Sequence, residues 1–142
     1  MKTTMLTAAV LAFGLTQGAM AAGLDGTWEP LSNTATSITG SIEVAEDSIT
    51  FEDGSTLAIA ADGSEKGKWG DQQAAVEGSI FRIDPPKDLT LLNGNKFCGL
   101  PGNKPTYLVL APFDDGMSLI VYTGDAKPTP DADPCAIYNY AK

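Results

Sequence analysis

The chain has two cysteines, Cys98 and Cys135, and the sequence leaves few possible roles for them. The chain contains no histidine, so two thiols supply too few ligands for a zinc site. A redox-active pair is usually a close C-x-x-C, whereas these cysteines lie far apart in the chain. A structural disulfide is the remaining interpretation, and it requires an oxidising compartment.

The N-terminal sequence predicts export to such a compartment. Lys2 is followed by an apolar run over residues 5–15 and then by small residues in the A-x-A pattern that signal peptidase recognises. The run is shorter than the roughly 20 apolar residues that cross a bilayer, which disfavours the alternative of an uncleaved anchor. We therefore expect residues 1–22 to be a signal peptide, cleaved after Ala21 or Ala22.

The remaining residues, 23–142, have the length of one domain. With export, the sequence predicts a Cys98–Cys135 disulfide and a periplasmic or secreted location. No later apolar run is long enough to insert into a membrane. The chain has 18 acidic and 9 basic residues, a balance that repels nucleic acid and anionic lipid and is compatible with a cationic partner.

The absence of histidine also excludes most nucleophilic catalysis. Ser-His and Cys-His systems are ruled out, so acid–base chemistry would fall to Asp, Glu, Lys or Tyr. Acidic pairs occur in turn sequences, where carboxylates are usually solvated, at Glu46-Asp47, Glu52-Asp53 and Asp114-Asp115. We expect no catalytic residue and no cofactor, and hence a protein that is not an enzyme.

One acidic loop raises the question of calcium. Asp125, Asp131 and Asp133 lie in a proline-rich segment, and hard cations prefer oxygen ligands. The segment lacks the glycine and the terminal glutamate of an EF-hand loop. We expect no specific metal site, while the pattern leaves calcium binding by this loop open.

Short runs of alternating apolar and polar residues, bounded by Gly, Asp, Asn and Pro, predict an all-β chain. For example, Ile38, Ile42 and Val44 would share one face of a strand. With a first strand at Trp28, about eight strands are expected, the others over residues 37–44, 48–52, 55–60, 74–83, 106–113, 117–124 and 135–140. Such spacing is typical of a sandwich or a small antiparallel β-barrel, and we favour the barrel because closure removes exposed edges.

Two irregular segments interrupt the strands. Residues 84–105 are rich in proline and glycine, with a turn signal at Asn93-Gly94 that predicts a short hairpin between residues 91–92 and 96–97. Residues 124–134 form the acidic, proline-rich loop. Because each segment carries or adjoins one cysteine, the disulfide would hold both at the same end of the sheet. A tight turn is expected at Asp114-Asp115.

Gly26-Thr27-Trp28 resembles the first strand of lipocalin and avidin-like barrels, which often begin with Gly-x-Trp. In those families the indole closes one end of the barrel, and lipocalins usually stack a late-strand arginine on it; the last expected strand here, 135–140, has none. The whole exported part is also similar to short exported bacterial β-rich proteins of unknown function, through "GTWEPLSNTATSITG", "LLNGNKFCG", "PTYLVL" and "CAIYNY". That resemblance implies only export and β-structure.

Two functional hypotheses follow. The first is a binding module of the bacterial envelope that holds a small ligand inside the barrel, at an open end ringed by Ser32, Asn33, Thr34 and Thr36. The interior would be lined by Trp28, Trp69, Phe81, Tyr107, Tyr122, Tyr138 and Tyr140, unless these residues fill a dry core. The main ligand-contacting candidates are Trp28, Ser32, Asn33, Trp69, Tyr107 and Tyr122.

The second hypothesis is a protein inhibitor of a cationic envelope hydrolase, such as lysozyme or a protease. A rigid, disulfide-linked β-domain loses little entropy on binding, and its acidic loops would accelerate encounter with a basic enzyme. Either function is compatible with a barrel, so the fold alone does not choose between them.

Overall fold

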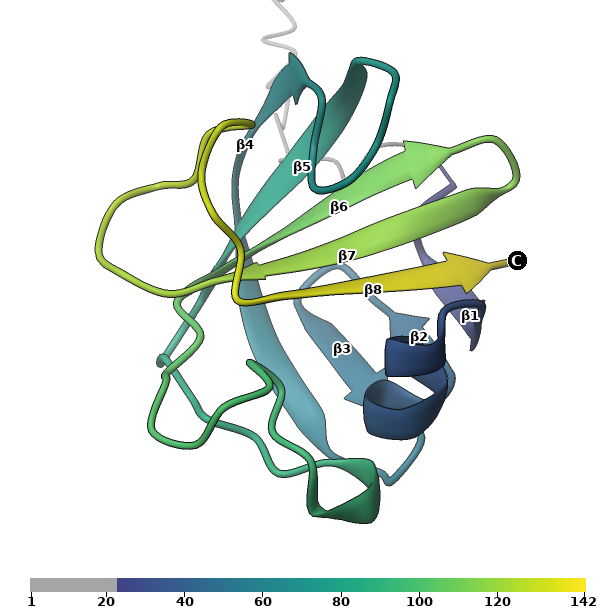
Figure 1. Ribbon diagram of the computed structural model, residues 1–142, viewed down its shortest axis with the longest axis vertical. Helices are drawn as coiled ribbons and strands as arrows, with labels where there is room; N and C mark the ends of the chain where they lie inside the picture. Colours follow the sequence, from purple (N-terminus) through teal and green to yellow (C-terminus); the bar gives the residue numbers. More distant parts are fainter. Residues whose placement is uncertain (1–22) are drawn as a thin grey trace, which may run out of the picture.

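The computed structural model describes residues 23–142, and the expected signal peptide lies outside them. Antiparallel strands form a closed barrel in which each strand pairs with its neighbours in sequence and the last pairs with the first (Figure 1). The strands are β1 (Gly26–Pro30), β2 (Ile42–Val44), β3 (Ser48–Phe51), β4 (Thr56–Gly67), β5 (Val76–Ile83), β6 (Tyr107–Phe113), β7 (Gly116–Tyr122) and β8 (Ala136–Ala141). The predicted eight-stranded barrel is confirmed. Over residues 23–142, none of the helical segments has the length and apolarity to cross a bilayer.

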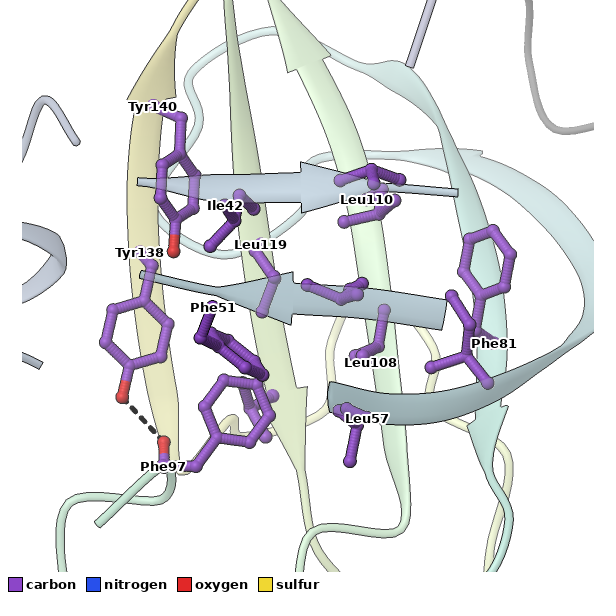
Figure 2. Close-up of a cluster of buried hydrophobic side chains, with 14 of the residues drawn as sticks. Ile42, Phe51, Leu57, Phe81, Phe97, Leu108, Leu110, Leu119, Tyr138 and Tyr140 are labelled. Carbon is purple, nitrogen blue, oxygen red and sulfur yellow. Dashed lines mark hydrogen bonds between the residues drawn. The ribbon is translucent and has the colours of Figure 1, made fainter. Parts of the chain in front are cut away.

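Alternate residues of the strands point inward and fill the barrel with side chains (Figure 2). The interior aromatic residues are Trp28, Phe51, Phe81, Phe97, Tyr138 and Tyr140. Tyr138 donates a hydrogen bond to the carbonyl oxygen of Phe97 at 2.6 Å, and the Tyr140 hydroxyl lies 2.6 Å from that of Thr39. These buried hydroxyls therefore have partners, and burial raises the pKa of both tyrosines.

A second apolar cluster lies on the outer wall of the barrel. It comprises Trp69, Ile80, Val109, Ala111, Ile120 and Tyr122, with Val76, Tyr107, Ala132 and Ile137 partly buried against it. Leu108 and Leu110 belong to the interior while Val109 and Ala111 belong to this cluster, so β6 is buried on both faces. Trp69 and Ala132 come from the two connections that cover this wall, residues 68–75 and 124–134.

The irregular segment 84–105 covers the end of the barrel at which β8 begins (Figure 1). Its apolar side chains, Leu89, Leu91, Phe97 and Cys98, join the interior cluster. The Phe97 ring lies 5.3 Å from the Phe51 ring and 5.7 Å from the Tyr138 ring, between centroids. The predicted disulfide is present, with the Cα atoms of Cys98 and Cys135 5.2 Å apart, and it joins this segment to the residue preceding β8.

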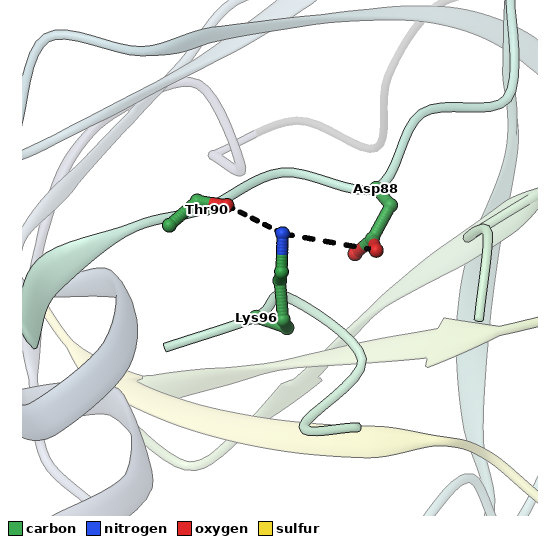
Figure 3. Close-up of polar contacts among 3 residues, drawn as sticks. All are labelled: Asp88, Thr90 and Lys96. Atoms are coloured by element: carbon green, nitrogen blue, oxygen red, sulfur yellow. Dashed lines mark hydrogen bonds and ion pairs between the residues drawn. The ribbon is translucent and has the colours of Figure 1, made fainter. Parts of the chain in front are cut away.

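Polar contacts shape the same segment. Leu92–Gly94 forms a 3-10 turn, η2, with Asn93 at φ 58°, so the predicted turn is present. The pairing around it is limited to one bridge, between Thr90 and Lys96. Figure 3 shows the Lys96 ammonium donating to the Thr90 hydroxyl at 2.6 Å and lying 3.9 Å from Asp88. The expected hairpin is thus reduced to a turn closed by a bridge and a side-chain contact.

The strand predicted over residues 37–44 is wrong in its first half. Ala35–Thr39 forms a π-helical turn, η1, closed by the hydrogen bond from Gly40 N to Ala35 O at 2.7 Å. Gly40 has φ 62°, and a Cβ there would overlap the Glu52 side chain, so the chain turns sharply before β2 begins. Ile38 therefore contacts the core from η1 rather than from a strand. Its spacing of four from Ile42 suits either element.

Two other strand boundaries are informative. The run predicted over residues 55–60 continues as β4 to Gly67, with a register shift against β5 between Ala61 and Ser64. Its second half is polar and pairs with β5, so hydrophobic alternation did not reveal it. The predicted turn at Asp114-Asp115 is confirmed, because Phe113 pairs with Gly116.

Candidate functional site

The structure separates the expected ligand-contacting residues. Trp28 lies in the interior cluster, whereas Trp69, Tyr107 and Tyr122 lie in or against the outer-wall cluster. The expectation that these three residues line the barrel interior is wrong. Residues 68–75 fold back over β5–β7 and place the Trp69 indole on the outer face of those strands, where Tyr107 and Tyr122 also point.

Trp28 is buried in the interior cluster and lines only a smaller cavity, of about 340 Å³, which it shares with Leu24, Lys142 and the β6–β7 turn. Its side chain is 4% exposed, and its indole N–H donates to the carbonyl oxygen of Leu24 at 2.9 Å. The Lys142 ammonium lies 4.5 Å from the centre of the ring and donates to Asp25 O at 2.9 Å. A cation thus stacks on this indole without an arginine, because a lysine directly after β8 supplies it.

A groove lies on the outer wall of the barrel. It has a volume of about 560 Å³, within the range of small-molecule sites. Its lining residues come from the chain after β1, from residues 71–76, and from β6, the β6–β7 turn, β7 and β8: Leu31, Ser32, Asp71, Gln72, Gln73, Ala74, Val76, Phe113, Asp114, Ser118 and Asn139. Ser32 is the one predicted site residue among them.

Strand register places the polar floor of this groove. Ala111 on β6 pairs with Ser118 on β7, and Ser118 pairs with Asn139 on β8, so the three residues form a row across the wall. The backbone N–H groups of Leu31 and Ser32 both donate to the carbonyl oxygen of Asn139, at 2.8 and 3.2 Å. The row therefore continues directly into the chain that follows β1.

Side-chain hydrogen bonds connect this row. The Gln72 amide donates to Ala111 O at 3.0 Å and to Ser118 Oγ at 3.3 Å. Ser118 donates to Asn139 Oδ1 at 2.6 Å, and the Asn139 backbone N–H donates to Ser32 Oγ at 3.2 Å. Within residues 23–142, the buried Gln72 Oε1 has no hydrogen-bond partner. The floor is thus a fixed polar network with one unused acceptor.

The walls are apolar and the rim is acidic. Leu31 is 60% exposed and is one of two large apolar side chains that the described residues expose. Val76 and Phe113 also line the groove and are partly buried. Asp71 and Asp114 contribute the only charged side chains of the lining. An exposed apolar wall beside placed polar groups is the usual composition of a binding site.

Sequence reasoning missed Gln72, Ser118 and Asn139. A signal was present for two of them, because Ser118 and Asn139 are polar residues inside the apolar runs "MSLIVY" and "CAIYNY". Ser118 is nonetheless 1% exposed, so its hydroxyl makes hydrogen bonds within the network and not with solvent. Asn33, which was expected in the site, is exposed and accepts a hydrogen bond from Ser37 through its carbonyl oxygen at 2.8 Å.

A smaller cavity, of about 360 Å³, lies between Tyr122 and residues 123–133. The Tyr122 hydroxyl is buried without a hydrogen-bond partner among the described residues. Burial raises the pKa of Tyr122 to about 12, so the phenol stays neutral at physiological pH. Residues 23–142, the Asp125–Asp133 loop included, contain no group of three or more His, Cys, Asp or Glu arranged to hold a metal ion.

Gly78→Ala tests whether Trp69 fixes the outer wall. A Cβ at position 78 would lie 2.6 Å from Trp69 Cε2, so we expect the indole to move and the free energy of unfolding to fall by about 1–3 kcal/mol. Urea unfolding followed by circular dichroism measures the loss. In the Trp69→Leu background the same change should cost much less. Equal costs in both backgrounds would contradict the assignment.

Comparison with protein-family models, with curated proteins and with solved structures finds no match.

Proposed function

We propose that this chain is an exported, non-enzymatic binding protein of the bacterial envelope, and that it holds a small ligand in the outer-wall groove. The observation that carries the proposal is the exposed Leu31 wall beside the Gln72–Ser118–Asn139 network. The groove combines this apolar side chain with a small number of placed polar groups, which is the usual composition of a small-molecule site.

The groove is a better ligand site than the barrel interior. The interior holds Phe51, Phe81, Phe97, Tyr138 and Tyr140, each 2% exposed or less, and a ligand would have to displace them. The groove is open, and its floor is held by hydrogen bonds before any ligand arrives. Binding there would require little rearrangement, which lowers its entropic cost.

The envelope location is supported by two features. The Cys98–Cys135 disulfide indicates an oxidising compartment outside the cytoplasm. The signal-peptide pattern of residues 1–22 favours a periplasmic or secreted protein in particular. A ligand taken from that environment would reach the groove directly, since the groove faces solvent.

Ala74→Trp tests the groove. The probe is N-phenyl-1-naphthylamine, a neutral dye that fluoresces when it leaves water. Ala74 lines the groove and is exposed, so an indole there should occupy the site and weaken dye binding at least about tenfold, equivalent to roughly 1.4 kcal/mol.

Ala75→Trp is the matched control. Ala75 is the exposed next residue and does not line the groove, so this variant should bind the dye as the parent does. Dye binding that is absent from the parent, or equal in both variants, would refute the proposal that the groove is the site. Circular dichroism confirms that each variant is folded.

A further inference from the structure

We propose that the ligand of the outer-wall groove is a small organic cation, an ammonium or guanidinium group on an apolar stem. This inference rests on the proposed function of the groove and assigns the chemical class of its ligand. It follows from the charges of the rim, the unused acceptor in the floor and the exposed apolar wall.

The charges of the groove are of one sign. Asp71 and Asp114 line it, and no lysine or arginine does. Within residues 23–142 the ion pairs are Arg82–Asp84, Lys96–Asp88 and Lys127–Asp62, so neither lining carboxylate is neutralised by a paired cation there. A concave surface lined by one sign of charge raises the local concentration of the opposite ion. The groove should therefore attract cations and repel carboxylates and phosphates.

The floor contains one buried hydrogen-bond acceptor without a partner among residues 23–142. The Gln72 amide nitrogen donates to Ala111 O and Ser118 Oγ, which fixes the amide orientation and leaves Oε1 as the free atom. A buried acceptor without a partner is unfavourable, because it loses its hydrogen bonds to water without a replacement. Ammonium and guanidinium groups carry only donors, whereas an anion would bring further acceptors. Because this oxygen has almost no exposed surface, a cationic head would reach it through a small shift of the Gln72 side chain, and would stay close to the acidic rim.

The apolar walls of the groove favour a ligand with an apolar stem. Leu31, Val76 and Phe113 form an apolar surface beside the polar floor, and Leu31 is largely exposed. An aliphatic or aromatic stem would remove this surface from water while its charged head remained at the carboxylates. A fully hydrated inorganic cation would leave the wall exposed to water, so burial of the wall would not contribute to its binding.

The test compares three compounds with the same eight-carbon stem: octylammonium, octanol and octanoate. Displacement of N-phenyl-1-naphthylamine from the purified protein is measured for each compound at pH 7 and low salt, below its micelle concentration or, for octanol, its solubility limit. We expect octylammonium to act at about tenfold lower concentration than octanol, and octanoate to be the weakest. Raising the salt to 0.15 M should reduce the advantage of octylammonium, because exposed charges are then screened.

Substitutions then locate the charge effect. Asp71→Asn and Asp114→Asn should each reduce the preference for octylammonium over octanol several-fold while octanol is unaffected. Asn tolerates the positive φ of 36° at position 114, so the turn should be retained. Asp115→Asn is the matched control, since Asp115 is the neighbouring acid of the same turn and does not line the groove.

The outcomes separate this inference from the proposed function. If Ala74→Trp abolishes dye binding but the three compounds compete equally, the groove is a binding site and the cation inference is wrong. If the dye does not bind in the groove, the proposed function itself fails. If lysozyme, a basic protein, displaces the dye and octylammonium does not, the small-cation inference is overturned in favour of a basic protein surface.

Discussion

Replacing Trp28 with alanine should lower the free energy of unfolding by about 3–5 kcal/mol, as for other large buried side chains. The indole is 4% exposed and belongs to the interior cluster, so its loss leaves a cavity inside the barrel. The Leu24 carbonyl also loses the indole N–H, its partner at 2.9 Å. A domain of this size is usually stable by about 5–15 kcal/mol, so the variant should unfold at much lower urea concentration.

Two further variants divide this effect into its parts. Trp28→Phe keeps an aromatic ring and removes the hydrogen bond to Leu24, so it should cost less than the alanine variant. Lys142→Ala removes the ammonium above the ring, a contact worth about 0.5–1 kcal/mol at an exposed position. Urea unfolding by far-ultraviolet circular dichroism measures all three. A loss below about 1 kcal/mol for Trp28→Ala would show that the indole does not support the core.

The barrel could be predicted because strand periodicity and turn chemistry agree. "TYLVLAPF" and "MSLIVYTG" flank two adjacent aspartates, and the structure closes that hairpin at Phe113 and Gly116. The disulfide and the strands follow from equally simple signals. Local signals suffice to predict a meander, because each strand pairs with its neighbours in sequence.

The second apolar cluster was harder to foresee. The sequence "YLVLAPF" is almost continuously apolar, which is typical of a strand buried on both faces, yet a barrel strand needs burial on one face only. What covers the outer face depends on where residues 68–75 and 124–134 fold back, and no short-range pattern encodes that. Trp69 was therefore assigned to the wrong side of the sheet.

The groove could not be predicted for the same reason. Its floor unites Gln72, Ser118 and Asn139 through the register of β6, β7 and β8 together with a connection that crosses them. The sequence predicts Ser32 as part of an open end of the barrel, whereas the structure pairs it with Asn139 on the last strand. Closure of the barrel brings the two together, and only the folded chain displays that contact.

Removing the disulfide should lower the free energy of unfolding by about 4 kcal/mol, as loop-closure entropy gives for a crosslink that spans 37 residues. Replacing both cysteines with alanine is the clean test, because Cys98→Ser alone would bury a hydroxyl and leave a free thiol. Reduction of the parent protein should give a similar loss. Thermal and urea unfolding measure it, and an unchanged melting temperature in the variant would contradict the prediction.

The loss should appear first in the segment that the disulfide holds. The interior side chains of residues 84–105, among them Phe97, reach the core from a segment with little regular structure, and the bond joins it to the start of β8. The amide of Phe97 donates to Leu89 O at 3.1 Å. Removal of the disulfide should increase the hydrogen-exchange rate of this amide more than it increases the rates of amides in β6 and β7. If all these amides accelerate together, the disulfide stabilises the barrel as a whole and the segment is no separate unit. Faster exchange confined to the segment would show that the crosslink keeps Phe97 between Phe51 and Tyr138.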